Sequence, residues 1–252
     1  CEKLAVQLGG IAQRGRAGSA GDLNSIFDLT MAKYGRIDSV LIHVSGPPKG
    51  DLLDIPEEDW DKANDMVLKP VIRMAKLVTP VMEKQGGGSI VNITTFSAFE
   101  PSLTFPTSSV YRVGVSSFTK LYSDRYGPAN IRMNCLLPGF TDSLDLPQKF
   151  ADMSSLKRLA RAEEQAKVAA FLLSDDSSYM TGQSLRADGG VTRHRCQVPR
   201  TAINLPLEAL LGPRTADRCW RPAVPDATLI KIVYRYPIIL YLMRTEPKVL
   251  KE

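Results

Sequence analysis

The 252-residue sequence contains few residues of the kinds that bind metals or form disulfides. It has two histidines, His43 and His194, and four cysteines, at positions 1, 135, 196 and 219, with no regular spacing among them. Zinc sites need several such ligands at short, characteristic spacings, so we expect no metal site. The chain opens on the polar residues Cys1-Glu2-Lys3 with no apolar run behind them, which predicts no secretory signal. Scattered cysteines in such a chain indicate a reducing compartment, the cytoplasm.

The sequence also lacks a long uninterrupted apolar run. Its most apolar stretch, Thr228 to Met243, is broken by Lys231, Arg235 and Pro237. A membrane-spanning helix needs about 18 or more apolar residues in a row, so no transmembrane segment is predicted. Binding to a membrane surface, formation of a strand pair and contact with a partner protein all remain open for this stretch.

Charge and proline content divide the chain near residue 193. The segment 194–252 holds ten of the 32 Lys and Arg residues, five of the 27 Asp and Glu residues, and seven of the 17 prolines. By subtraction, residues 1–193 carry 22 charges of each sign, so the net charge of +5 belongs to the tail. We therefore predict a body, 1–193, and an irregular, Pro-rich basic tail, 194–252. The basic residues are scattered, so nucleic-acid binding is not expected.

The body shows apolar patterns typical of alternating strands and helices. Short runs rich in β-branched residues, such as Ser89 to Thr95, predict buried parallel strands. Longer segments repeat apolar residues at helical spacing, and Leu23 to Tyr34 is one of them. This order predicts an α/β fold with a doubly wound parallel sheet. The other expected elements are strands at Asp38 to Val44 and Ile131 to Leu137, and helices at Pro56 to Gln85 and Thr107 to Tyr126.

Several motifs occur in an order that resembles the short-chain dehydrogenase/reductase family. They are Lys33 to Asp38 leading into Val40 to Gly46, Glu58-Asp59-Trp60, Ser89 to Thr95, Pro138-Gly139, Phe171 to Asp175, Tyr179 to Gln183 and Asp188-Gly189-Gly190. The resemblance covers roughly residues 3 to 193. It implies a Rossmann-like fold, NAD or NADP as cofactor and a small carbonyl or alcohol as substrate. It also implies a homodimer or homotetramer joined through the helices at 56–85 and 107–126.

In this family a Tyr exchanges the proton, a Lys four residues later lowers its pKa, and an upstream Ser polarises the carbonyl. Aligning Ser116 to Lys120 with the end of the family's helix places Ser108 at the Tyr position, Arg112 at the Lys position and Thr95 at the Ser position. Thr95 keeps a hydroxyl and Arg112 keeps a positive charge. An isolated Tyr titrates near ~10 and needs such a cation to work at neutral pH. Ser108 is too weak an acid to replace the Tyr.

Tyr111 is the alternative proton donor, but position 115, where its cation would stand, is Val115. On an ideal helix Tyr111 is turned about 60° from Ser108, so it either serves as a displaced catalytic residue or packs against a neighbouring segment. Val67 stands where the family has the Asn of a proton relay. His43 stands where the family has an Asn near the nicotinamide, and it either faces the cofactor or is a satisfied strand residue.

The resemblance places Asp22, Gly46, Pro138, Gly139 and Ser143 near the cofactor. Asp22 is also expected to be the N-cap of the helix Leu23 to Tyr34. No strand followed by a Gly-rich turn precedes Leu8-Gly9-Gly10, so the phosphate-binding turn is absent from this sequence. The family's first strand, first helix and second strand are thus expected to be missing from the chain.

Two functions follow. The first is an NAD(P)-dependent oxidoreductase with Thr95, Tyr111 or Arg112 at its site. The second is a catalytically inactive relative that acts as a binding protein or has no function. In either case, the strands at 40–44 and 90–93 would have exposed apolar flanks unless residues 227–243 fold back over the sheet.

Overall fold

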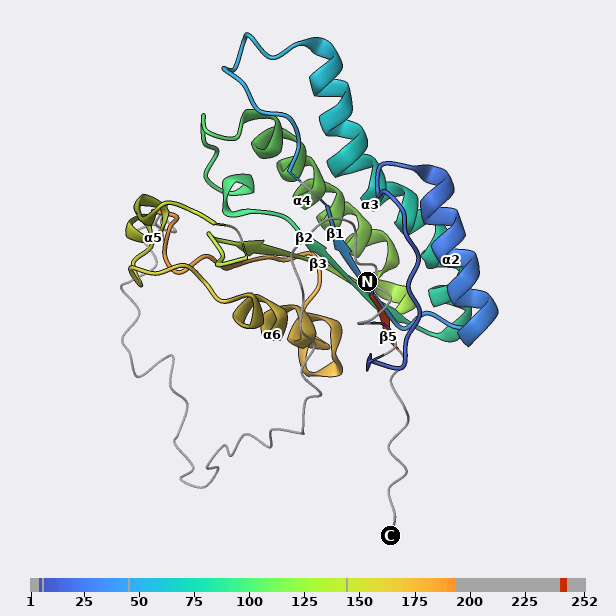
Figure 1. The fold of residues 1–252 in the computed structure, drawn as a ribbon. Helices are drawn as coiled ribbons and strands as arrows, with labels where there is room; N and C mark the ends of the chain where they lie inside the picture. Colours follow the sequence, from blue (N-terminus) through green and yellow to red (C-terminus); the bar gives the residue numbers. More distant parts are fainter. Residues whose placement is uncertain (1–4, 6, 45, 144, 194–240, 244–252) are drawn as a thin grey trace, which may run out of the picture.

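Strands and helices alternate along the part of the chain that the computed structural model describes, which is residues 5, 7–44, 46–143, 145–193 and 241–243 (Figure 1). Three short 3-10 helices, at Phe96–Ala98, Gly127–Ala129 and Asp175–Ser177, join the longer elements. The longer elements, in chain order, are α2 Ala20–Tyr34, β1 Ser39–His43, α3 Glu57–Gln85, β2 Gly88–Ile93, α4 Pro106–Tyr126, β3 Ile131–Pro138, α5 Gln148–Met153, α6 Ala162–Leu173, β4 Ser184–Ala187 and β5 Tyr241–Met243.

The strands form one sheet in the order β4-β3-β2-β1-β5. Strands β1 to β4 are parallel, and β5 pairs antiparallel with β1. In the central register Val40 lies beside Ile90, and Ile90 lies beside Met133. The α/β class with a Rossmann-like parallel sheet is therefore confirmed, and the helices cover both faces of the sheet (Figure 1).

Alternate residues of each strand enter two separate apolar clusters. Val40, Ile42 and Ile90 pack with residues of α3 and α4, and α2 adds Leu23 to this cluster. Leu41 and Val91 point to the opposite face and pack against α6. Parallel strands that are buried on both faces consist of continuous apolar runs, which is why the sequence of these strands shows no polar alternation.

The carboxyl end of α6 is held by side chains from three neighbouring strands. The Ser39 hydroxyl donates to the Leu173 carbonyl at 3.2 Å, and the Ser89 hydroxyl donates to the Leu172 carbonyl at 2.9 Å. Arg132 of β3 also donates to the Leu172 carbonyl. The last carbonyls of a helix have no partner within the helix, so these contacts satisfy groups that would otherwise be buried without hydrogen bonds.

The start of α2 differs from the expected one. The helix begins at Ala20, and its N-cap is Ser19, whose hydroxyl accepts from the Asp22 backbone N–H at 3.2 Å. The prediction that Asp22 is the N-cap was therefore wrong, because a competent capping hydroxyl occurs three residues earlier. Asp22 lies in the first turn, where a negative charge is favourable, and its carboxylate accepts from the Arg16 N–H at 2.7 Å.

The expected tail, 194–252, lies outside the described residues except for β5. The domain boundary near residue 193 and the irregular character of the tail thus stay predictions. Within the described part of the chain, no helix is long and apolar enough to cross a membrane. Strand β5 pairs with β1, and the other residues of the stretch expected to fold back, 227–240, lie outside the described residues.

Candidate functional site at the carboxyl ends of the strands

Candidate site residues follow the carboxyl ends of β1, β2 and β3, where open parallel sheets bind their ligands. Thr95 comes two residues after β2, and Pro138 ends β3. Arg112, on the first half of α4, reaches the same edge, because its guanidinium donates to the Ile93 carbonyl at 2.9 Å and to the Val44 carbonyl at 3.4 Å. The structure therefore brings the Arg112 guanidinium to the ends of β1 and β2. Thr95 lies two residues after Ile93, whose carbonyl accepts one of these hydrogen bonds.

Arg112 is almost fully buried, with 6% of its surface exposed. Its Nε donates to the Ser108 hydroxyl at 3.1 Å, so the residues at the family's Tyr and Lys positions contact each other one helical turn apart. His43, at the end of β1, lies near this cation. Burial, reinforced by the charge of Arg112, lowers the pKa of His43 to about 4. His43 is thus neutral at physiological pH.

Thr95 is half-buried and immediately precedes the short helix Phe96–Ala98. Its backbone carbonyl accepts from the Ala98 N–H at 3.0 Å, which fixes the turn after β2. The neighbouring Thr94 hydroxyl is directed elsewhere, to the Leu136 carbonyl at 3.3 Å. Thr95 thus lies just past the end of β2, and a role of its hydroxyl as donor to a carbonyl oxygen stays a prediction.

Tyr111 packs against α3. Its ring centroid is 6.1 Å from that of Trp60, and the ring adjoins the larger apolar cluster. Burial raises the pKa of Tyr111, which is opposite to what a proton donor at neutral pH requires. Val115 is buried, with 1% exposed, so no cation stands one turn after Tyr111. These contacts favour the packing interpretation, and a catalytic Tyr111 stays a prediction.

Three of the residues expected near the cofactor, Pro138, Gly139 and Ser143, lie at the carboxyl end of β3 or in the loop that follows it. Gly139 must be glycine for steric reasons, because a Cβ there would lie 2.6 Å from the Asp188 carbonyl oxygen. This close approach joins the ends of β3 and β4, whose residues Pro138 and Ala187 are paired. The Ser143 hydroxyl forms a hydrogen bond of 2.8 Å with that of Thr141 in the next loop.

The other two expected cofactor residues are placed differently. Asp22 binds the loop that precedes α2, and α2 packs on α3. Gly46 follows β1, and a Cβ at this position would meet no atom within 4 Å. A role of any of these residues in cofactor binding stays a prediction.

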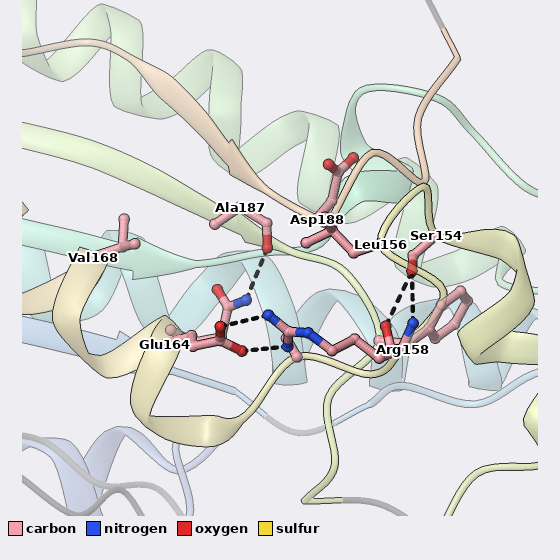
Figure 2. A pocket seen from close by; sticks show the side chains of 11 residues that line it. Ser154, Leu156, Arg158, Glu164, Val168, Ala187 and Asp188 are labelled. Atoms are coloured by element: carbon pink, nitrogen blue, oxygen red, sulfur yellow. Dashed lines mark hydrogen bonds and ion pairs between the residues drawn. The ribbon is translucent and has the colours of Figure 1, made fainter.

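A pocket that sequence reasoning missed lies between α6, the loop before it and the end of β4 (Figure 2). It has a volume of about 150 Å³. Glu164 lines it and forms two 2.7 Å contacts with Arg158, and this pairing lowers the pKa of Glu164 to about 2. Gln165, 4% exposed, donates to the Ala187 carbonyl at 2.8 Å. Nothing in the spacing of these residues indicated a shared pocket.

Metal ligands do not gather in the described part of the chain, where no group of three or more His, Cys, Asp or Glu side chains could hold an ion. Cys135 is buried in β3, and burial raises the pKa of its thiol.

Comparison with known proteins settles the family. A family model described as Enoyl-(Acyl carrier protein) reductase matches residues 1–192. "Dehydrogenase/reductase SDR family member 4" of Pongo abelii is 34% identical over 183 residues, which cover 69% of this chain and 66% of that protein. The chain belongs to the short-chain dehydrogenase/reductase family. The resemblance seen in its motifs is thereby confirmed.

Other members of this family show the same similarity. The 3-oxoacyl-(acyl-carrier-protein) reductase FabG of Thermotoga maritima is 35% identical over 177 residues, 67% of this chain and 72% of that protein. The crystal structure of YwfH, an NADPH dependent reductase involved in bacilysin biosynthesis, matches with a TM-score of 0.69 at 27% identity, covering 76% of this chain and 82% of that one. A short-chain dehydrogenase/reductase structure from Burkholderia xenovorans gives a TM-score of 0.68 at 25% identity, and the match covers 74% of this chain and 76% of that one.

Proposed function

We propose that this chain is an NAD(P)-dependent oxidoreductase that transfers a hydride between a nicotinamide and a small carbonyl or alcohol. The observation that carries the proposal is the position of Arg112, buried across the ends of β1 and β2 and one helical turn after Ser108. The NADPH-dependent relative YwfH supports a nicotinamide cofactor. The match spans only 66% of the length of the Pongo abelii relative, so cofactor and substrate class are both part of the proposal.

Carbonyl reduction adds a hydride to carbon and a proton to oxygen. The nicotinamide, when bound, supplies the hydride. In this chain Thr95 would donate a hydrogen bond to the carbonyl oxygen, and Arg112 would contribute positive charge near the developing alkoxide. Ser108 stands where a phenol would deliver the proton, and an aliphatic hydroxyl is a far weaker acid. We therefore expect slow turnover, limited by proton delivery.

The second candidate function is a non-catalytic member of the family that acts through binding. Two contacts favour it. The Ser108 hydroxyl is bonded to Arg112, and Tyr111 is engaged with Trp60. Neither residue offers a phenol beside a cation, so the described site contains no proton donor of the usual strength.

Turnover of the purified full chain with NADH and NADPH and a panel of small aldehydes and ketones tests the proposal. Oxidation of the reduced cofactor should be measurable, should fall on Thr95→Ala, and should rise on Ser108→Tyr combined with Arg112→Lys. The matched control is Val115→Lys, which places a cation one turn after Tyr111 and should not raise the rate. Absence of turnover in both the parent and the double variant would favour the binding-protein alternative. Activation by Val115→Lys alone would identify Tyr111 as the proton donor.

A further inference from the structure

The amide of Gln165 belongs to the wall of the pocket between α6 and β4, and one of its polar atoms is unpaired (Figure 2). Gln165 is 4% exposed, and its Nε2 donates to the Ala187 carbonyl at 2.8 Å. A carbonyl only accepts, so this bond fixes the orientation of the amide and turns its oxygen away from the Ala187 carbonyl. Within the described part of the chain, that Oε1 atom is buried and has no hydrogen-bond partner. A buried acceptor without a donor costs free energy, so the pocket favours an occupant that supplies a donor.

The other polar side chains of the wall already have partners. Glu164 is paired with Arg158, and the Asp188 carboxylate accepts from both the backbone N–H and the hydroxyl of Thr192. The Ser154 hydroxyl donates to the Arg158 carbonyl at 3.0 Å. The charges of the wall are therefore paired or hydrogen-bonded within the protein, which favours a neutral ligand.

Apolar side chains form much of the remaining wall, and they are Phe140, Leu156, Ala160 and Val168. The ring of Phe140 is held edge-on by that of Phe96, with 5.1 Å between the ring centroids. The pocket has a volume of about 150 Å³, and an apolar cavity of that size accommodates a molecule as large as benzene. A buried water needs about two to four polar partners, so the single unpaired side-chain acceptor favours an organic occupant over a lone water.

We propose that this pocket binds a neutral aromatic or short aliphatic molecule with one hydroxyl group, which donates a hydrogen bond to Gln165 Oε1. The apolar part of the ligand would pack against Phe140 and Val168. The pocket lies beside the end of β4, whereas Thr95 and Arg112 lie at the ends of β2 and β1, beyond β3 in the sheet. This inference therefore does not depend on the oxidoreductase proposal.

Phenol and toluene are matched probes, because they have nearly the same shape and only phenol has a donor. Their affinities for the full chain are measured by NMR titration, with the isotope-labelled methyl groups of Leu156 and Val168 as reporters of the pocket. Gln165→Met removes the acceptor at similar side-chain size. Gln183→Met is the matched control, because the exposed Gln183 amide also donates to a backbone carbonyl, that of Thr181 at 3.0 Å, outside the pocket. Val168→Phe fills the pocket and leaves Gln165 in place.

We expect the parent chain to bind phenol about tenfold more tightly than toluene, a factor that corresponds to one buried hydrogen bond. Gln165→Met should bind phenol about tenfold more weakly than the parent and should bind toluene equally well. Gln183→Met should behave like the parent, and Val168→Phe should bind neither probe. Circular dichroism checks that each variant is folded.

Three results would overturn the proposal. They are equal affinity of the parent for both probes, unchanged phenol affinity in folded Gln165→Met, and phenol binding that leaves the methyl signals of Leu156 and Val168 in place. If Gln165→Met does not fold, the comparison of phenol with toluene in the parent and the loss of phenol binding in Val168→Phe decide the matter.

Discussion

Replacing Arg132 by methionine should strongly destabilise the body. Arg132 is 9% exposed, and its guanidinium donates to Ser177 Oγ at 2.8 Å, the Ser177 carbonyl at 3.0 Å and the Ser174 carbonyl at 2.8 Å, with longer contacts to the Leu172 and Met180 carbonyls. Methionine fills similar volume but removes these hydrogen bonds, although each carbonyl keeps another donor, such as the Met180 N–H at the Ser177 carbonyl. A hydrogen bond from a charged donor contributes about 1.5–3 kcal/mol.

The loss is partly offset because the variant no longer buries a charge. Burial lowers the pKa of Arg132, which shows that the folded environment disfavours its charged form. With the three shorter hydrogen bonds of the guanidinium lost, other donors kept at the carbonyls and this relief included, we expect a net decrease of about 2–4 kcal/mol in the free energy of unfolding. That is a large part of a typical stability of ~5–15 kcal/mol.

Urea denaturation followed by circular dichroism measures this change. Arg132→Lys keeps the charge but cannot reach Ser174 and Ser177 together, so it should lie between the parent and the methionine variant. Arg125→Met, on the exposed surface of α4, is the matched control and should shift stability by no more than about 0.5 kcal/mol. If Arg132→Met unfolds at the same urea concentration as the control, the hydrogen bonds of Arg132 do not stabilise the body.

Lys157 has a φ of 55°, so Lys157→Gly should raise the melting temperature by removing a strain of about 1 kcal/mol, whereas Lys149→Gly inside α5 should lower it. The folded-state pKa of Glu164 is about 2, below its ordinary value of 4.5, so its stabilising contribution is complete above pH 4.5 and is lost as the pH falls towards 2. Glu164→Gln should remove this part of the pH dependence of the melting temperature. A variant whose melting temperature changes with pH in parallel with that of the parent would contradict the pairing of Glu164 with Arg158. His43 stays neutral down to about pH 4, so stability should decrease as the pH falls from 6.5 to 4. In a chain in which His194 is replaced by alanine, an NMR titration midpoint near 6.5 for His43 would refute the burial of His43.

The strands and helices of the body could be predicted from the sequence because their apolar patterns are long and regular. The strand expected at Ser89 to Thr95 is Gly88–Ile93, and the helix expected at Thr107 to Tyr126 is Pro106–Tyr126. Element ends were less accurate where two residues could serve the same purpose. Ser19 and Asp22 are both good helix caps, and only the packing of the loop before α2 decides between them.

Part of the candidate site could also be predicted. The register placed Ser108 and Arg112 four residues apart on one helix, a spacing at which side chains meet, and the structure contains a hydrogen bond between them. The direction of the Arg112 guanidinium, towards backbone carbonyls of β1 and β2, could not be predicted, because it depends on the distance between α4 and the strand ends. The pocket beside Glu164 was also missed, since it forms only where α6 and β4 meet the loop that carries Arg158.

The two ends of α6 are attached in different ways. Its carboxyl end is held by buried side chains from β1, β2 and β3, whereas at its amino end the buried Gln165 donates to the Ala187 carbonyl of β4 and the exposed pair of Arg158 and Glu164 contributes little. A 12-residue helix is a rod of about 18 Å. Glu164 and Gln165 both line the pocket of Figure 2, so the contacts that attach the amino end of α6 to the Arg158 loop and to β4 are also part of the pocket wall.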